Sequence, residues 1–315
     1  MVREQQNKSS VQHLVITADQ SGRRIDNYLL AYLKDVPRTH IYKMLRKGEV
    51  RVNRSRVKQD YKLVEEDVVR IPPIHHDQGK TRQISPSPGL QGLIYNNILH
   101  EDDNLLVLNK PAGIAVHAGT NEPFGIIEIL RAMRPEDSFL ELVHRLDKST
   151  SGCLLIARHH RILRELHRLL KERRINKTYL ALLKGKFSRN KTITLPLAKH
   201  SSRSGQHRVK VHESGKAAAS RFEPLKMLDD ATLVRVEIDT GRTHQIRVHA
   251  ATMGHPVAGD EKYGDRDFNR MLKQLGLKRM FLHAESLKLK LPGYGKQMTF
   301  TAPLPKDLKD CLEKL

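Results

Sequence analysis

The sequence predicts an α+β fold in two units: a small N-terminal α/β domain, and a larger domain with a mixed, mainly antiparallel sheet flanked by helices. The chain has 315 residues, enough for two domains with separate cores. A polar stretch with several glycines and prolines, residues 75–97, separates two parts that carry periodic apolar residues. In the second part, strand-like and helix-like runs alternate irregularly, without the repeating rhythm of a parallel α/β fold.

Residues 11–74 form the predicted N-terminal domain. Apolar residues recur at helical spacing in two segments, and short runs rich in β-branched residues indicate strands on either side of them. The predicted elements, in order, are a strand at 13–17, helices at 25–33 and 39–48, and strands at 50–52 and 68–71.

Residues 98–315 form the predicted second domain, and residues 75–97 form the linker before it. The four consecutive apolar residues 105–108 indicate a buried strand. The other main elements expected here are helices at 124–133 and 162–170, and strands at 179–183 and 231–238.

The composition indicates a polyanionic partner. The chain has 56 Lys and Arg against 35 Asp and Glu, a net charge of +21, and binding to phosphates would then be salt-sensitive. An anionic membrane surface is the alternative, but the sequence has neither a lipidation motif nor a long basic amphipathic helix. No window approaches the roughly 18 apolar residues of a membrane span, and residues 1–10 lack the apolar core of a signal peptide. We therefore expect a cytoplasmic protein with no membrane partner.

The cysteine and histidine patterns predict neither a disulfide nor a metal site. Cys153 and Cys311 are the only cysteines and lie far apart, which fits a reducing compartment. The 17 histidines form no His-Glu-x-x-His pattern. A phosphate-binding loop of the form Gly-x-x-x-x-Gly-Lys-Ser/Thr is also absent. We therefore expect no metal and no nucleotide cofactor.

Residues 144–156, with the sequence HRLDKSTSGCLLI, are the most informative stretch. A polar break separates two apolar runs, and Asp147 lies in this break between Arg145 and Lys148. Loops held between regular elements carry much of protein chemistry. An Asp before Ser-Thr-Ser-Gly is also a common turn former, so the spacing alone leaves both interpretations open.

The same stretch resembles the catalytic motif of the RluA-type pseudouridine synthases: His-Arg-Leu-Asp, then Ser-Gly and an aliphatic strand. Further segments similar to that family occur in the family's order across residues 98–303, and such an ordered series is far more specific than one four-residue match. These segments are residues 109–113, 177–181, 241–249, 254–256 and 281–284. Residues 215–222 depart from the family pattern, with Ala217 in place of Pro and Ser220 in place of Thr.

The resemblance implies isomerisation of uridine to pseudouridine within RNA, a rearrangement that consumes nothing and needs no cofactor. Asp147 would then be the catalytic nucleophile or base. Tyr179 would stack on the target base, and Arg247 would pair with Asp147. The base has to leave the helical stack to be reached, and Arg145 is at the family position that holds it out. Phosphate contacts are expected from two further residues, Lys110 and Arg242.

Arg247 is also placed by its own surroundings in the sequence. Thr243 can cap a helix over residues 244–253 that Gly254 would end. Arg247 would then lie in the early turns, where the helix dipole also favours an anion. A nearby fixed cation favours the ionised form of a carboxylate. Without the motif, a surface ion pair would be the alternative interpretation of this residue.

The N-terminal unit carries a second resemblance. Between Arg38 and Lys58 there are eight Lys or Arg and one acid, Glu49; this is either a solvated basic face or a surface that follows phosphates. Residues 21–26 and 39–53 resemble the small RNA-binding domain named after ribosomal protein S-four, and the likeness covers most of residues 14–72. The candidate RNA-binding residues are Arg38, Lys43, Arg46, Lys47, Arg51 and Arg54.

Taken together, the likeness of both units implies 23S ribosomal RNA as substrate and partner, and we expect a monomer. An RluD-type or a transfer-RNA synthase of the same fold is the nearest alternative. A non-catalytic RNA-binding factor in ribosome assembly is an alternative from another class, and the intact set of Asp147, Tyr179 and Arg247 argues against it.

Overall fold

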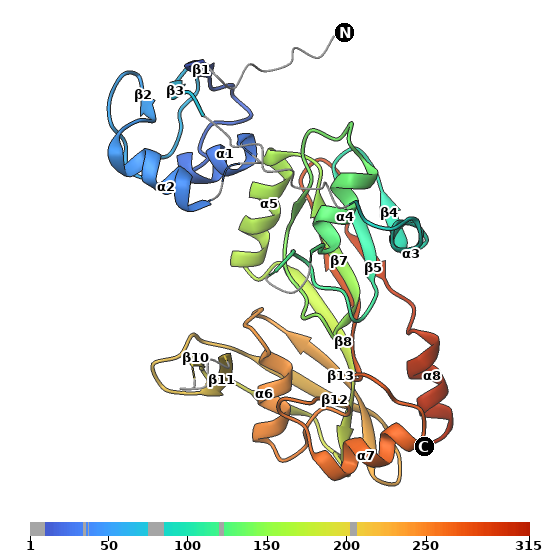
Figure 1. Cartoon of the computed structure of the whole chain (residues 1–315). Helices are drawn as coiled ribbons and strands as arrows, with labels where there is room; N and C mark the ends of the chain where they lie inside the picture. Colours follow the sequence, from blue (N-terminus) through green and yellow to red (C-terminus); the bar gives the residue numbers. More distant parts are fainter. Residues whose placement is uncertain (1–9, 34–35, 37, 75–84, 120–122, 202–206) are drawn as a thin grey trace. The chain divides into compact units, whose positions relative to one another are not determined.

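The structure is a computed structural model that describes residues 10–33, 36, 38–74, 85–119, 123–201 and 207–315 (Figure 1). The chain divides into two compact units, Met1–Gln83 and Ile84–Leu315. The fold class expected from the sequence is confirmed in both.

The first unit contains a small antiparallel sheet and the helices α1 (Ile25–Tyr32) and α2 (Arg38–Lys47). The sheet has the order β1-β3-β2, formed by β1 (Gln12–Val15), β3 (Val68–Ile71) and β2 (Arg51–Val52). Apolar side chains at helical spacing explain why both helices pack on it: they join one buried cluster with the inward side chains of the strands. The helix α2 begins one residue earlier than the sequence suggested, at Arg38.

A helix also forms where the sequence predicted linker. The helix α3 (Pro88–Tyr95) is capped by Ser87, whose Oγ accepts a hydrogen bond from the backbone N–H of Leu90 at 3.3 Å. Ile94 of this helix is fully buried in the core of the second unit. The glycines in the segment made it look irregular, whereas the serine cap, Pro88 in the first turn and burial of Ile94 outweigh their low helix propensity. The rest of the predicted linker, residues 75–84, lies outside the described residues.

The second unit is built on a ten-stranded mixed sheet. Its main order is β4-β5-β7-β14-β8-β13-β12-β9, with β15 paired to β14 and β6 paired to β7. The pair β7–β14 is parallel, and the other strand pairs described in this sheet are antiparallel. The strands are β4 (Ile98–Glu101), β5 (Leu105–Lys110), β6 (Glu141–Leu142), β7 (Ser151–Ala157), β8 (Ile175–Lys184), β9 (Lys191–Ile193), β12 (Ser220–Met227), β13 (Ala231–Ile238), β14 (Leu282–Leu289) and β15 (Met298–Thr301). A separate hairpin joins β10 (Leu197–Ser201) to β11 (His207–Val211).

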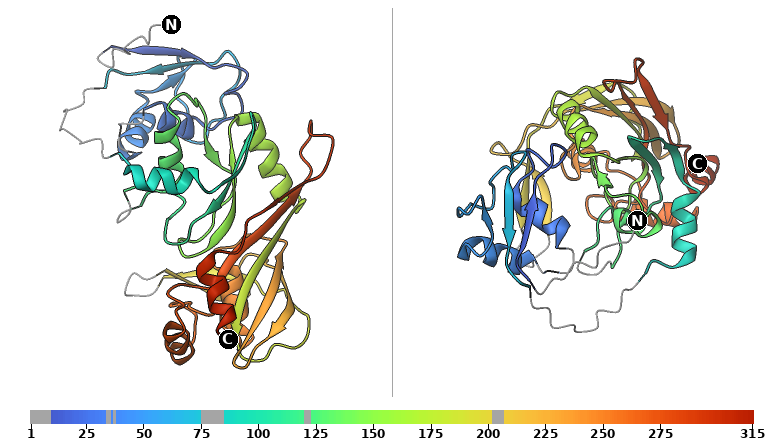
Figure 2. Two further views of the ribbon diagram at one scale, coloured as in Figure 1. Left: turned by 90° about the vertical axis from the view of Figure 1, so that its right-hand side faces the viewer. Right: turned by 90° about the horizontal axis from the view of Figure 1, so that it is seen from above.

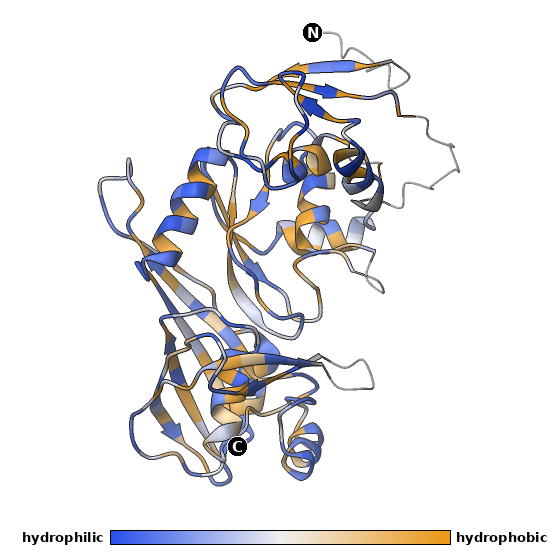
Figure 3. Ribbon diagram, turned by 90° about the vertical axis from the view of Figure 1, so that its left-hand side faces the viewer, coloured by the Kyte–Doolittle hydropathy of each residue, from blue (hydrophilic) through white to orange (hydrophobic). Residues whose placement is uncertain are grey.

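Helices cover both faces of this sheet because its side chains are apolar on both sides. In β7, Leu154 and Ile156 belong to the cluster that includes α4 (Ile126–Met133). The alternate residues Cys153 and Leu155 pack with α5 (His160–Lys171) on the other face. In Figure 3, α5 is coloured in alternating hydrophilic and hydrophobic bands, as expected for a helix with one buried side.

The long strand β8 repeats this pattern farther along the sheet. Its Ala181 and Leu183 face the cluster that includes residues of α6 (Gln245–Thr252). Leu182 faces the opposite cluster, formed with α7 (Arg266–Gln274) and α8 (Lys306–Glu313), and these two helices lie beside this end of the sheet in Figure 2. Tyr179 belongs to the same cluster as Ala181 and Leu183, so it lies on the face that α6 covers. None of the helices in the described part of the chain is long and apolar enough to cross a bilayer.

Candidate active site

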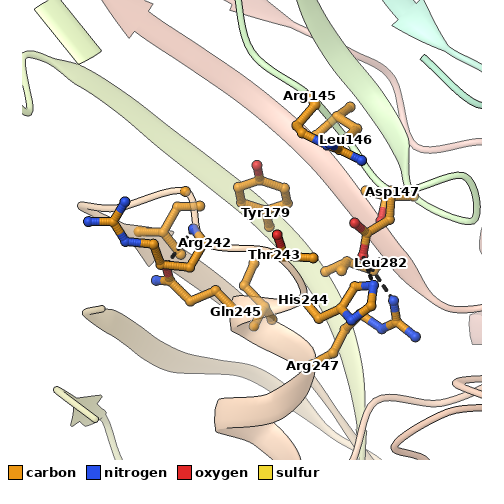
Figure 4. Close-up of a pocket in the computed structure, with 14 residues that line it drawn as sticks. Arg145, Leu146, Asp147, Tyr179, Arg242, Thr243, His244, Gln245, Arg247 and Leu282 are labelled. Atoms are coloured by element: carbon orange, nitrogen blue, oxygen red, sulfur yellow. Dashed lines mark hydrogen bonds and ion pairs between the residues drawn. The ribbon is translucent and has the colours of Figure 1, made fainter. Parts of the chain in front are cut away.

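A pocket in the second unit brings together three segments that are far apart in the sequence (Figure 4). The loop from β6 to β7 contributes Arg145 and Asp147, and β8 contributes Tyr179. The third segment runs from the end of β13 into the first turn of α6, and it includes Arg242 and Arg247. Five of the six residues that the sequence placed in the catalytic site therefore line one pocket.

Asp147 lies in a turn and also lines the pocket. The sequence left open whether it forms a turn or carries chemistry, and its position is compatible with both. Its carbonyl oxygen accepts the backbone N–H of Thr150 at 3.1 Å, which closes the turn. Its carboxylate Oδ2 accepts a hydrogen bond from Nη1 of Arg247 at 2.9 Å, and 23% of the side chain is exposed. No side chain in the described part of the structure hydrogen-bonds to Oδ1. The carboxylate is thus held by one oxygen and available through the other.

Close packing of two strands explains why glycine follows this loop, at position 152. Gly152 has φ of 112°, and a Cβ atom there would lie 2.2 Å from the backbone oxygen of Ala284. Ser151 and Gly152 are the residues through which β7 pairs with β14. Only glycine permits this close approach of the two strands, and the pairing fixes the end of the loop that carries Asp147.

Arg247 is held by a second carboxylate that the sequence analysis missed. Its Nε and Nη2 donate to Oδ2 and Oδ1 of Asp260 at 2.7 and 2.9 Å. Asp260 is fully buried and also accepts the backbone N–H groups of Lys262 and Tyr263. Burial alone would raise the pKa of Asp260, but the hydrogen bonds and charge of Arg247 lower it. The only signal in the sequence was an Asp after Gly259, close to the Gly-His-Pro segment.

The first turn of α6 carries Arg247, as expected, but its start differs from the prediction. His244, not Thr243, precedes the first helical residue, and its side chain makes no capping hydrogen bond. Gln245 anchors the start instead: its Oε1 accepts from the Thr240 hydroxyl at 2.7 Å and from the Arg242 N–H at 3.1 Å. The buried Gln245 side chain thus ties the first turn of α6 to the preceding loop, but it accepts no helix N–H as the predicted threonine cap would have done.

Tyr179 belongs both to the core and to the pocket. Its side chain is buried, with 8% of the residue exposed, and it packs in the main apolar cluster. Its ring also lines the pocket, where Figure 4 shows it between Arg145 and Thr243. Burial, with a smaller effect of Asp147, raises the pKa of Tyr179 well above its ordinary value, so its hydroxyl stays protonated.

The remaining candidate residues differ in their exposure. Arg145 and Arg242 are exposed and line the pocket, and Nε of Arg242 donates to the Ala217 oxygen at 3.1 Å. In the described part of the chain, no three side chains of the metal-binding types gather in a cluster that could hold a metal ion.

Lys110 is where the structure contradicts the sequence prediction. It is fully buried, and its Nζ donates to the carbonyl oxygens of Pro111, Ile114 and Lys148 at 2.7, 2.8 and 3.2 Å. Burial and the nearby Arg279 lower the pKa of Lys110 to about 7, against the effect of Asp147. These three hydrogen bonds join the Asp147 loop to the segment after β5. Because the Lys110 amine is buried and already paired, it cannot contact a phosphate.

Five of the six candidate RNA-binding residues of the first unit have described side chains, and all five are exposed. Lys43, Arg46 and Lys47 lie on α2, and Arg51 and Arg54 lie on β2 and the turn that follows it. The side chain of Arg38 lies outside the described residues. The apolar residues of α2 face the core, so its basic residues occupy the solvent side.

Known proteins that are similar to this chain identify its family. The sequence profile described as RNA pseudouridylate synthase matches residues 104–252, and that of the S4 domain matches residues 23–69. The chain is 50% identical to Ribosomal large subunit pseudouridine synthase C of Haemophilus influenzae over 308 residues, 98% of this chain and 96% of the relative. This chain belongs to the RNA pseudouridylate synthase family. The family resemblance, which includes synthase C members, and the predicted class of enzyme, an isomerase, are confirmed.

Two further likenesses support the assignment. The synthase C of Escherichia coli is 50% identical over 309 residues, covering 97% of each chain. Among solved structures, human RNA Pseudouridylate Synthase Domain Containing 1 is similar with a TM-score of 0.58 and 28% identity, covering 72% of this chain and 90% of that one.

Proposed function

We propose that this protein converts specific uridines of 23S ribosomal RNA to pseudouridine. The relatives with which it shares half of its residues are named for the large ribosomal subunit. The observation that carries the catalytic part of the proposal is the Asp147 carboxylate: Arg247 holds one of its oxygens, and the other is available at the pocket. This substrate would place the enzyme in the cytoplasm, and we propose that it acts as a monomer.

The reaction needs one reactive carboxylate and a base that can turn. The bond from uracil N1 to the ribose breaks, the base rotates, and C5 bonds to the same sugar carbon. The hydrogen on C5 is lost, and N1 gains one, so the change is a net isomerisation with no oxidant, reductant or cofactor. Asp147 is the group we assign as nucleophile or base. Arg247 orients this carboxylate through the hydrogen bond from its Nη1 to Oδ2.

Tyr179 and Arg145 would hold the nucleotide for this chemistry. A uridine in a helical stack has to swing out before its glycosidic bond can be reached. The Tyr179 ring at the pocket offers a flat surface for the extruded base. The exposed Arg145, two residues before Asp147, would occupy the space that the base leaves, and Arg242 would bind a phosphate at the pocket mouth.

The first unit would add affinity for RNA. Exposed Lys and Arg side chains on α2 and the β2 turn can follow a phosphate backbone without reading its sequence. We propose that the chain has two domains with separate roles. Residues 11–74 bind RNA, and the domain that follows carries out catalysis. The catalytic domain begins before residue 98, since α3 packs on its core.

Mapping pseudouridines in the 23S RNA of a strain that lacks this protein tests the proposal. We expect specific pseudouridines to disappear, to return with the wild-type gene, and to stay absent with the Asp147→Asn variant. Unchanged 23S RNA together with a loss of pseudouridine from transfer RNA would instead identify a transfer-RNA synthase. Return of the modification with Asp147→Asn would contradict the role of Asp147.

A further inference from the structure

His244 occupies a strained position at the pocket wall. Its backbone is left-handed, with φ 55° and ψ 22°, a conformation that costs a residue with a side chain about 1 kcal/mol. Its ring lines the pocket, and its Nε2 lies 3.8 Å from Oδ2 of Asp147, which is too long for a hydrogen bond. Strain that the fold maintains at such a site suggests a role for the side chain.

Hydrogen bonds determine which ring nitrogen of His244 carries the proton. The backbone N–H of Val209 in β11 donates to Oη of Tyr263 at 2.8 Å, and this Oη lies 2.9 Å from Nδ1 of His244. The Tyr263 oxygen already accepts a hydrogen from Val209. Among the described residues, Nδ1 of His244 is the acceptor within reach of the Tyr263 hydrogen. A neutral His244 then carries its own hydrogen on Nε2.

The surroundings favour this neutral state. Burial lowers the pKa of His244; Arg247 and Lys262 lower it further, while Asp147 and Asp260 raise it. Burial also raises the pKa of Tyr263, which keeps its hydroxyl protonated as a donor.

The ring nitrogen Nε2 therefore presents a hydrogen at the pocket. In the described part of the chain, no oxygen lies within hydrogen-bond distance of it. A phosphate is a poor partner there, because its charge would meet the Asp147 carboxylate within about 4 Å. An uncharged oxygen carries no such penalty, and a bound uridine offers several.

We propose that His244 contacts the substrate: its Nε2–H donates a hydrogen bond to an uncharged oxygen of the target uridine, the ribose 2′-hydroxyl or a uracil carbonyl. Tyr263 is the positioning residue that fixes the ring for this contact. The same Tyr263 ring lies under Arg247, whose Cζ is 5.1 Å from the ring centroid, so it supports both neighbours of Asp147. This inference rests on the proposed function, since it requires that the pocket binds a uridine.

The test compares His244→Ala with His244→Gln in full-length protein. Both variants carry the same backbone strain, but glutamine keeps an N–H donor near the position of Nε2. The assay is tritium release from C5-labelled RNA under single-turnover conditions with saturating enzyme. We expect His244→Ala to lose roughly 10- to 100-fold in rate, the cost of one hydrogen bond near a reacting centre. His244→Gln should recover part of that loss.

Tyr263→Phe tests the positioning role without touching the His244 ring. It should lower the rate less than His244→Ala, and adding it to His244→Ala should cause little further loss, because the two residues act as one unit. Tyr294→Phe is the matched control, since the Tyr294 hydroxyl donates to Asp102 and does not line the pocket. It should react at the wild-type rate.

RNA with 2′-deoxyuridine at the target position identifies the acceptor. If the 2′-hydroxyl accepts the hydrogen, wild-type enzyme binds this RNA more weakly, and His244→Ala causes no additional loss of affinity. If a uracil carbonyl accepts it, the loss caused by His244→Ala persists. Both results support the contact.

Wild-type rates and affinities in folded His244→Ala would overturn the inference, and so would a glutamine variant no better than alanine. Should His244→Ala fail to fold, a wild-type rate in Tyr263→Phe alone would overturn it. Asp147→Asn is measured in the same assay: its inactivity leaves the proposed function standing whatever His244 does, whereas a normal rate contradicts that function separately.

Discussion

The two units are both rich in basic residues, but they hold them in different ways. Around the pocket, Arg247 is buried between two carboxylates, and Lys110 is fully buried among three carbonyl oxygens. On α2, Lys43, Arg46 and Lys47 are exposed to solvent. A buried basic side chain with fixed hydrogen-bond partners sets geometry, whereas exposed cations supply a salt-dependent attraction to phosphates. Positive charge in the sequence therefore indicates an RNA partner, and burial decides what each charged residue does.

The largest effect is expected where a buried cation serves a reactive group. Asp147→Asn keeps the size of the side chain but removes its nucleophilic and basic character, so tritium release should fall on the order of 10⁴-fold or more. RNA affinity and the unfolding midpoint should change little. Asp267→Asn, at a highly exposed carboxylate on α7, is the matched control. Release near the wild-type rate in Asp147→Asn would refute the catalytic assignment.

Arg247→Met should lower both activity and stability. It leaves Asp260 buried without its partner, which costs about 3–5 kcal/mol in the free energy of unfolding, and it releases Asp147. Adding Asp260→Asn should restore part of the stability, because no buried charge is then unpaired, but it should not restore activity. Urea unfolding and single-turnover rates separate the two effects. Recovery of activity in the double variant would show that Arg247 acts on the fold alone.

The sequence predicted some residues of the pocket correctly and others not. Motif order identified the segments that meet at the pocket, because Asp147, Tyr179 and Arg247 each lie in a distinctive local sequence. Asp260 was missed since an aspartate after a glycine is common, and nothing in the local sequence shows that it will be buried against Arg247. Lys110 was misassigned for the same reason: its three acceptors belong to segments up to 38 residues away, and its burial depends on the tertiary fold.

Local structure was predicted best where apolar periodicity is strong. The helices α1 and α5 and the strands β5 and β13 follow from their patterns of buried residues. The helix α3 was missed because two glycines interrupt it, and its stability comes from packing on another segment. The predicted start of α6 was wrong because His244, not Thr243, precedes the helix, and the Gln245 side chain ties its first turn to Thr240 and Arg242.

Lys110→Met should lower the free energy of unfolding and leave the salt dependence of RNA binding unchanged. The Pro111 and Ile114 carbonyls would lose their donor, which costs about 1–3 kcal/mol for each group left buried and unpaired. The slope of log affinity for RNA against log salt should stay at the wild-type value, because Lys110 does not reach a phosphate. A shallower slope would restore the sequence-based prediction of a phosphate contact.

The smallest effect on stability and rate is expected on α2. Its exposed basic residues should matter for RNA binding and not for the fold, the opposite of Lys110. Replacing Lys43, Arg46 and Lys47 with Gln removes exposed charges that do not touch the buried core, so the free energy of unfolding should change by less than about 0.5 kcal/mol. Affinity for 23S RNA should fall, and the salt slope should become shallower by about 0.9 for each phosphate of duplex RNA that is no longer neutralised, or about 0.7 for single strands.

Replacing the exposed Lys226, Lys288 and Lys309 of the second unit removes the same number of charges and is the matched control. The rate at saturating enzyme should remain at the wild-type value, because these residues do not line the pocket. An affinity and slope equal to those of the control would mean that the basic face of α2 is only a solvated surface.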